Sequence, residues 1–385
     1  MAHDEVKLVE LASYISRGIT PSYTVSEGVC VINQKCIRNG KLSLNETRLH
    51  NEAKKKVPAD KIVQTMDILV NSTGTGTLGR VAQVTDNIRA TVDSHVTIVR
   101  PAKEVNPLFL GYAVKWRQPY IEALAEGSTG QTELSRFRLG DEITIPLPSL
   151  AAQKQIAETL YAIDCKINTN SMINDNLQQQ AAALFANFYD HAETEVSFTE
   201  IIQILGGGTP KTGESSYWNG NVPFFTPKDV GSPYTLSTEK TITEEGLAHC
   251  NSRLYPVNTV FVTARGTVGK VGLPGVPMAM NQSCYALVGK ETHQLLVYFY
   301  TLKAVDRLKH KASGAVFDAI TTRDFESETI MKLSDEDAKG FLDVAEPIYQ
   351  AVLSNSIENL RLATLRNSLL PKLMSGEIDV SDIQL

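Results

Sequence analysis

The feature that most constrains this chain is an internal repeat that covers most of its length. The segment RGITPS at 17–22 returns as GGGTPK at 206–211, and GTLGRV at 76–81 returns as GTVGKV at 266–271. A third segment, 153–189, aligns without gaps to residues 185 positions later. Because three segments recur in the same order at offsets of 185 to 190 residues, the chain is predicted to contain two copies of one structural plan.

The third repeated segment has the pattern of a long amphipathic helix. Apolar residues recur every three or four positions, Ser149 is a plausible N-cap, and Gly376 closes the second copy. At 1.5 Å per residue, a helix over 153–189 would be roughly 55 Å long. Two such helices would bury their stripes against each other. The stripe residues are Ile156, Leu160, Ile163, Ile167, Leu177, Leu184, Phe341, Ile348, Val352, Leu362 and Leu369.

Asn170 and Asn355 interrupt the two stripes at equivalent positions. A buried asparagine at such a position fixes the register of paired helices. An exposed asparagine is equally compatible with the pattern, so both interpretations stay open.

The remaining segments predict strands mixed with shorter helices. Asn106-Pro107 predicts the start of a helix over 108–126, with asparagine as its cap. Short β-branched runs predict strands at 67–70, 81–84, 95–99 and 259–262. The predicted fold is therefore α+β, and its expected parts are globular domains at 1–149 and 191–333 and helical segments at 150–190 and 334–385.

Charge is unevenly distributed along the chain. The net charge is −6, but residues 1–150 carry +2 and residues 196–330 carry 0, whereas residues 151–195 and 331–385 carry −4 each. A protein that gripped DNA alone would usually be more basic. Either the chain does not bind DNA, or a partner supplies much of the phosphate contact.

Several broad classes are disfavoured by composition. The five cysteines are scattered without a CxxC pair, which favours reduced thiols in a cytoplasm over disulfides or a zinc site. The start MAHDEVK has no apolar signal region, and no uncharged run is long enough for a membrane helix. We expect a cytoplasmic protein with no membrane contact.

Two motifs look catalytic but fit structural roles better. GTGTLG at 74–79 matches a dinucleotide-binding pattern, yet a strand rather than a helix is predicted after it, and ARGTVG at 264–269 lacks the first glycine. We interpret both as tight turns. Asn106-Pro-Leu-Phe109 resembles the Asn-Pro-Pro-aromatic signature of adenine methyltransferases, but it departs at the third position, and a helix cap explains it. The chain is predicted to bind rather than to catalyse.

Other segments suit nucleic-acid recognition. Glycine-rich backbone, hydroxyls and lysines are the usual partners of phosphate oxygens. Tyr217 and Trp218 look exposed, with a structural anchor as the alternative, whereas the basic runs 54–56 and 309–311 are more typical of a solvated face. The candidate DNA-binding residues are Thr20, Ser22, Lys35, Ser72, Thr73, Arg80, Thr209, Lys211, Thr212, Tyr217, Trp218, Lys228, Arg265, Lys270, Asn281 and Gln282.

These strings resemble one known family. GGGTPKTGESSYWNGNVPFFTPKD at 206–229, ARGTVGKVGLPGVPMAMNQSCYAL at 264–287 and SLLPKLMSGEI at 368–378 are similar to the type I restriction-modification specificity (S) subunits, and the first copy matches more loosely. In the first copy Arg17 stands where the second copy has a glycine, and the first copy lacks a Tyr-Trp-Asn-Gly stretch. DNA contacts are therefore not carried over from the second copy to the first.

The resemblance implies two target-recognition domains that alternate with two helices in an antiparallel coiled coil of pseudo-twofold symmetry. Each domain would read one half of an asymmetric, bipartite site on double-stranded DNA. The expected partners are two methyltransferase subunits on the helices together with restriction subunits. S-adenosylmethionine, ATP and Mg would belong to those partners, with no cofactor, metal or catalytic residue in this chain.

Recognition elements on one face of B-DNA lie about 34–36 Å apart, which a rod of roughly 55 Å can span. The length of this helix is then expected to set the number of unread base pairs between the two half-sites. A helical turn added within 153–189 should therefore change that number. Two alternatives stay open at this point. One is a repeat scaffold that never touches DNA, and the other is a fused DNA methyltransferase or nuclease.

Overall fold

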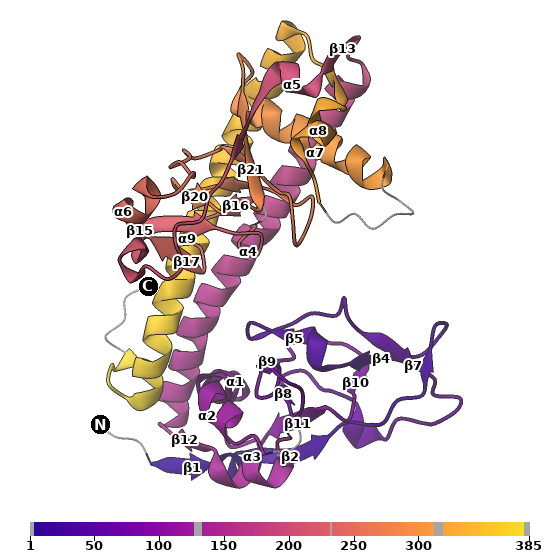
Figure 1. Cartoon of the computed structure of the whole chain (residues 1–385). Coiled ribbons are helices and arrows are strands. Elements are labelled where there is room, and N and C mark those ends of the chain that lie inside the picture. Colours follow the sequence, from indigo (N-terminus) through magenta and orange to yellow (C-terminus); the bar gives the residue numbers. More distant parts are fainter. Residues whose placement is uncertain (1–3, 127–132, 232, 312–318, 381–385) are drawn as a thin grey trace. The chain divides into compact units, whose positions relative to one another are not determined.

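A computed structural model describes residues 4–126, 133–231, 233–311 and 319–380 (Figure 1). The chain divides into two compact units: residues 1–165 with 363–385 form the first unit, and residues 166–362 form the second. Two long helices, α4 (Leu150–Asp190) and α9 (Asp335–Ser375), contribute to both units. They lie within the two segments predicted to be helical, 150–190 and 334–385.

Local capping explains where the long helices begin and end. The hydroxyl of Ser149 accepts a hydrogen bond from the backbone N–H of Ala152 at 3.3 Å, which confirms the predicted N-cap. The hydroxyl of Ser334 accepts one from the N–H of Asp337 at 3.1 Å and caps α9 in the same way. Gly376, with a φ of +74°, follows the last residue of α9, and this left-handed conformation favours glycine.

Each unit is built on an antiparallel sheet with the same strand order. In the first unit the order is β2–β11–β8–β9, with β2 at Ala12–Arg17, β11 at Val96–Pro101, β8 at Ile68–Asn71 and β9 at Val81–Gln83. In the second unit the order is β14–β21–β18–β19, with β14 at Ile202–Gly206, β21 at Cys284–Gly289, β18 at Val260–Thr263 and β19 at Val271–Pro274. The strands predicted at 67–70, 81–84, 95–99 and 259–262 are confirmed within a residue or two.

The smaller sheets repeat as well. In the first unit β4 (Val29–Ile32) pairs in parallel with β10 (Ala90–Val92) and β7 (Arg48–His50) joins β4 to β3 (Tyr23–Thr24). In the second unit β15 (Trp218–Phe225) pairs in parallel with β20 (Ala279–Met280), β17 (Lys240–Ile242) flanks β15, and β16 (Tyr234–Thr235) extends the main sheet.

The other short strands follow the same plan. A two-stranded sheet joins β1 (Glu5–Lys7) to β12 (Thr144–Pro146) in the first unit, and β13 (Thr194–Ser197) to β22 (Thr329–Lys332) in the second. The hairpin of β5 (Ile37–Arg38) and β6 (Lys41–Leu42) belongs to the first unit. The β5–β6 hairpin and β16 have no counterpart in the other unit, but the main sheets and the two-stranded sheets of the described residues follow the predicted duplication.

The helix predicted over 108–126 is divided in two. Asn106 caps α1 (Pro107–Trp116) by accepting from the N–H of Phe109 at 2.9 Å, as the sequence predicted. A second helix, α2 (Gln118–Ala123), begins after Arg117. Pro119 has no N–H to donate back along the chain, which explains the interruption.

Some of the remaining helices occupy matching places in the two units, since α3 precedes β12 as α8 precedes β22. The first unit adds α3 (Arg136–Glu142); the second unit contains α5 (Phe198–Ile201), α6 (Glu244–Ala248), α7 (Gln294–Lys311) and α8 (Thr322–Glu326). Helix α7 follows β21 as α1 and α2 follow β11. None of the helices in the described ranges has the length and apolar content required to cross a membrane.

The predicted stripe faces inward in both units. None of its eleven residues is exposed, and Leu160, Phe341 and Val352 are fully buried. In the second unit, Phe341 packs edge-on against Phe185 of α4 and Phe299 of α7, with ring centroids 5.4 and 5.1 Å apart. These contacts hold α7 against the paired helices.

Asparagines form a polar layer between α4 and α9 in the second unit. Asn170 donates to Asn359 at 3.0 Å, and Asn355 donates to Asn174 at 2.9 Å. From Asn170 to Asn174 the residue number on α4 rises, while that of the bonded residue on α9 falls from 359 to 355, so the two helices are antiparallel. Of the two predicted asparagines, Asn170 is 1% exposed and Asn355 is half-buried, and both are hydrogen-bonded across the pair, which favours the register-fixing interpretation over the exposed one. A shift of 185 residues exchanges the two contacts, so the layer itself follows the repeat.

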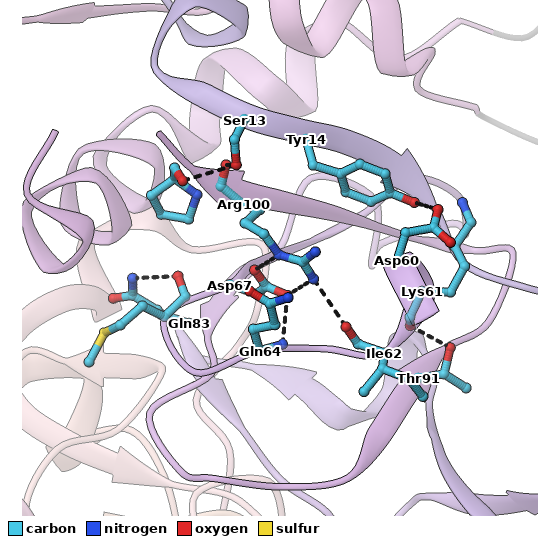
Figure 2. Close-up of polar contacts among 12 residues, drawn as sticks. Ser13, Tyr14, Asp60, Lys61, Ile62, Gln64, Asp67, Gln83, Thr91 and Arg100 are labelled. Atoms are coloured by element: carbon cyan, nitrogen blue, oxygen red, sulfur yellow. Dashed lines mark hydrogen bonds and ion pairs between the residues drawn. The ribbon is translucent and has the colours of Figure 1, made fainter. Parts of the chain in front are cut away.

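Two largely buried ion pairs join elements within the first unit. The carboxylate of Asp67 accepts from Nε and Nη2 of Arg100 at 2.9 and 2.8 Å and from the N–H of Gln64 at 2.8 Å (Figure 2). Between the helices, Asp164 accepts from Arg366 and from the hydroxyl of Tyr112. The first pair joins β11 to the start of β8, and the second fixes α1 and α9 on α4.

Candidate nucleic-acid interface

Four loops meet at one end of the strands of the main sheet in each unit. In the second unit they are residues 207–212 after β14, 226–229 after β15, 264–270 between β18 and β19, and 281–283 before β21. We call this surface the second interface. Backbone hydrogen bonds join the loops: Gly208 N to Met280 O at 3.0 Å, Asn281 N to Phe225 O at 2.9 Å, and Ala264 N to Ser283 O at 2.8 Å.

The first unit assembles the same four loops with matching hydrogen bonds. They are residues 18–22, 33–36, 72–80 and 93–95, which we call the first interface. The bonds are Ile19 N to Val92 O at 3.0 Å, Asp93 N to Ile32 O at 3.0 Å, and Ser72 N to His95 O at 2.8 Å. In both units a threonine of the glycine turn also reaches the loop after the parallel strand: Thr77 donates to Gln34 and Thr267 to Pro227, each at 3.1 Å.

Glycines make this convergence possible. A Cβ added to Gly18 would lie 1.9 Å from the carbonyl oxygen of Val92, and one added to Gly207 would lie 2.1 Å from that of Asn281. No side chain fits at either position. The repeated turns likewise contain Gly79 and Gly269 with φ of +82° and +73°, and a strand follows each turn. The interpretation of both motifs as tight turns is confirmed.

The second interface contains a cationic cavity of about 450 Å³. Lys228 from one loop, Arg265 from the glycine turn and Asn281 before β21 all line it, although they are far apart in sequence. Lys228 lies 4.0 Å from Glu239, and both are well exposed. Among the described residues, the exposed side chain of Arg265 has no hydrogen-bond or ion-pair partner. The full lining is Thr226, Pro227, Lys228, Glu239, Lys240, Arg265, Gly266, Thr267, Asn281 and Ser283.

The polar residues beside the cavity have specific local roles. Oδ1 of Asn281 accepts from the N–H of Ser283 at 3.0 Å, which leaves its amide NH₂ available to a ligand. The hydroxyl of Thr209 donates to the exposed side chain of Gln282 and holds two of the loops together. Lys211 and Thr212 are exposed on the same loop as Thr209. The structure thus brings most of the predicted residues of the second copy onto the four loops of this surface, and Lys270 closes the glycine turn there.

Tyr217 and Trp218 are half-buried rather than exposed. Nε1 of Trp218 donates to Lys211 O at 3.2 Å, and its ring packs edge-on against Phe224 with centroids 5.6 Å apart. The ring of Tyr217 stacks on His249 at 5.0 Å. These contacts fit the structural-anchor alternative. Their role in DNA contact stays a prediction.

The first interface has weaker cationic character. Thr20 and Lys35 are exposed, and Lys35 follows β4 as Lys228 follows β15. The hydroxyl of Thr73 lies 2.7 Å from Nδ1 of His95, and Arg80 donates to Gly76 O at 2.7 Å within its own turn. Ser22 lies beside the ring of His50, which accepts from its N–H at 2.9 Å.

Ser72 corrects one prediction. Its side chain is completely buried, and its hydroxyl is hydrogen-bonded to Thr97 of β11. A hydroxyl in that position is inaccessible to DNA. Ser72 instead links its loop to β11 through the hydrogen bond with Thr97.

Sequence reasoning also missed several residues of these surfaces. Lys240 and Ser283 line the cavity, and His95 occupies the place of Ser283 in the first unit. Lys240 and His95 lie outside the motifs quoted above, whereas Ser283 lies inside the segment 264–287 that resembles the specificity subunits. His95 begins the strand predicted at 95–99, whereas no predicted strand adjoins Lys240 or Ser283.

No group of three or more His, Cys, Asp or Glu side chains suited to a metal ion occurs within the described part of the chain. Burial raises the pKa of the Cys284 thiol to about 12 and also raises that of Cys36. All five cysteines are free thiols.

Two copies of one α+β unit, each with the same four-loop surface and joined through antiparallel helices, define an internally duplicated protein with two equivalent surfaces. Comparison with known proteins identifies its family. The chain belongs to the family of the type I restriction modification DNA specificity domain, whose model matches residues 4–179 and 193–333. It is a type I restriction-modification specificity subunit.

Individual relatives agree with this assignment. The chain is 23% identical to the type I restriction enzyme HindI specificity subunit of Haemophilus influenzae, over 87% of this chain and 92% of that one. It is 27% identical to the EcoR124I/EcoR124II specificity subunit of Escherichia coli, over 51% of each chain. The fold is similar to that of the type I S subunit from M. genitalium, with a TM-score of 0.62, 16% identity and 96% of each chain covered.

Proposed function

We propose that this chain reads two half-sites on one DNA duplex, one through each interface, and catalyses no reaction itself. The observation that carries the proposal is the duplicated set of four loops held by matching hydrogen bonds. A protein with two equivalent surfaces suits a target with two parts. Family membership favours this reading over a scaffold that never touches DNA or a fused methyltransferase or nuclease.

The chemistry of the second interface suits duplex DNA. Lysines and threonine hydroxyls bind phosphate oxygens, and an arginine can donate two hydrogen bonds to the major-groove edge of guanine. Lys228 and Arg265 supply those groups at one cavity, and the free NH₂ of Asn281 adds a donor.

The half-sites are expected to differ in sequence. Lys35 and Lys228 occupy the same place in the two units, but Thr73 replaces Arg265 and Asp93 replaces Asn281. Because the hydrogen-bonding groups differ at equivalent positions, the two interfaces would select different bases.

Catalysis would belong to partner proteins. Two methyltransferase subunits would bind the helical segments and carry S-adenosylmethionine, and restriction subunits would carry ATP and Mg. The net charge of −4 on each of the segments 151–195 and 331–385 suits basic protein surfaces rather than DNA. This assembly would act in the cytoplasm.

The test is to co-express the chain with its methyltransferase subunit and to map methylated bases. We expect one bipartite motif with N6-methyladenine in each half. Arg265→Ala should relax recognition at one base pair of one half-site by roughly 1–3 kcal/mol, while the other half-site stays unchanged. Lys290→Ala is the matched control, because Lys290 follows Gly289, at the end of β21 away from the second interface.

Three results would contradict the proposal. Methylation that is independent of this chain would refute its role in specificity. Failure of the complex to retain any specific DNA would favour the scaffold. Methyl transfer by the purified chain alone would favour the fused enzyme.

A further inference from the structure

The two glycine turns are covered by side chains of opposite charge. A Cβ added to Gly269 would lie 2.6 Å from Cε of Lys309 on α7, whose Nζ is also within contact distance at 3.4 Å. At the equivalent Gly79, the added atom would lie 2.4 Å from Cγ of Glu122 on α2. The helix that follows the sheet thus places a cation over one turn and an anion over the other.

Lys309 is positioned to bind a ligand. It lines a groove of about 470 Å³ together with Lys270, Gly269 and Asp306. Both lysines are exposed, and within the described ranges neither ammonium group has a hydrogen-bond or ion-pair partner. Asp306 lies 3.6 Å from His310 and is the acidic residue of the groove. Two unpaired cations therefore flank the turn that also carries Arg265.

The first unit has a different arrangement at the same place. Arg80 corresponds to Lys270, but it donates to Gly76 O within the turn. Glu122 is exposed and accepts from Gln118 at 2.9 Å. The hydrogen bond leaves the charge on Arg80, but the carboxylate of Glu122 offsets it, whereas the second turn carries two cations. The first turn is therefore expected to attract a phosphate less strongly than the second turn does.

We propose that Lys309, together with Lys270, binds the sugar-phosphate backbone of DNA beside the half-site read by the second interface, and that the first interface lacks this contact because Glu122 occupies the equivalent place. This inference rests on the proposed function. It assigns a role to Lys309 of the basic run 309–311, which the sequence alone indicated to be a solvated face, whereas Lys311 of that run pairs with Glu328. The two interfaces then hold their half-sites with unequal electrostatic strength.

Counterion release gives the expected size of the effect. Each phosphate neutralised contributes about 0.9 to the slope of log K against log salt concentration. Lys309→Ala should therefore reduce the magnitude of that slope by about 0.9 and weaken binding roughly fivefold at 0.15 M salt. Sequence discrimination should be unchanged, because phosphate contacts carry no base information.

The experiment measures DNA affinity of the complex between this chain and its methyltransferase subunits at several salt concentrations. The probes are duplexes with the mapped site and with either half-site scrambled. The variants are Lys309→Ala, Lys270→Ala, the double variant, Lys290→Ala as the charge-matched control, and Glu122→Lys. Thermal unfolding of each variant establishes that it is folded.

The proposal predicts smaller slopes for both interface variants, an additive loss in the double variant, no change in Lys290→Ala, and a steeper slope for Glu122→Lys. Equal slopes in Lys309→Ala, Lys290→Ala and the unmodified complex would overturn it. Selective loss of discrimination at the second half-site would also overturn it, because that result means a base contact. Failure of the proposed function is distinguishable, since the unmodified complex would then show no preference for the intact site.

Discussion

The buried ion pair between Asp67 and Arg100 gives a sharp test of the first unit. The side chain of Asp67 is 1% exposed and that of Arg100 is 16% exposed. In Asp67→Ala the guanidinium loses two hydrogen bonds and keeps the one that Nη2 donates to Ile62 O at 3.0 Å. Leaving such a buried charge without its partner costs about 3–5 kcal/mol of unfolding free energy.

The two tryptophans permit a measurement on each unit separately. Trp116 lies on α1 in the first unit, and Trp218 lies on β15 in the second. In a Trp218→Phe background, fluorescence during urea unfolding reports on the first unit. A loss of about 4 kcal/mol would lower the urea midpoint by about 2 M if the slope is about 2 kcal/mol per M.

The double variant Asp67→Leu with Arg100→Met is the control, because replacing both partners with apolar residues is often close to neutral. The reasoning is refuted if Asp67→Ala alone shifts the free energy by less than about 1 kcal/mol. It is also refuted if the double variant is as unstable as Asp67→Ala.

Three further predictions concern the second unit. Phe341→Ala should cost about 3–5 kcal/mol of unfolding free energy, measured by Trp218 fluorescence, because it removes a fully buried ring; a loss below 1 kcal/mol would contradict this packing. Gly207→Ala should reduce affinity for the half-site bound by the second interface roughly tenfold or more, a loss similar to that caused by one mismatched base pair. Gly18→Ala should do the same for the half-site bound by the first interface. Equal effects of either variant on both half-sites would contradict the assignment. Burial raises the pKa of the Cys284 thiol to about 12, so the native thiol should resist alkylation at pH 8, and rapid alkylation of the folded protein would refute this. Because the ordinary pKa of the thiol is near 9, the contribution of Cys284 to the free energy of unfolding should be complete below pH 9 and should decline as pH rises toward 12.

Local sequence patterns determined much of the architecture. The apolar spacing at Leu160 and Val352, the Ser149 cap and the glycine turns each depend on neighbouring residues, so they could be interpreted directly. The same patterns, repeated at offsets of 185 to 190, predicted the duplication. The split of the helix over 108–126 was missed, although Pro119 was the signal for it.

Tertiary structure alone decided the composition of the surfaces. Arg265 and Asn281 meet because β18 pairs with β21 in the main sheet, and Lys228 joins them because β15 pairs with β20, which leads into Asn281. No local pattern encodes these pairings. The same packing buried Ser72, half-buried Trp218 and placed Lys309 and Glu122 over equivalent glycines. The sequence by itself determined that there are two units of similar plan, because periodicity and turn chemistry are local. Which side chains each unit presents depends on pairings between residues tens of positions apart, and only the folded chain sets those.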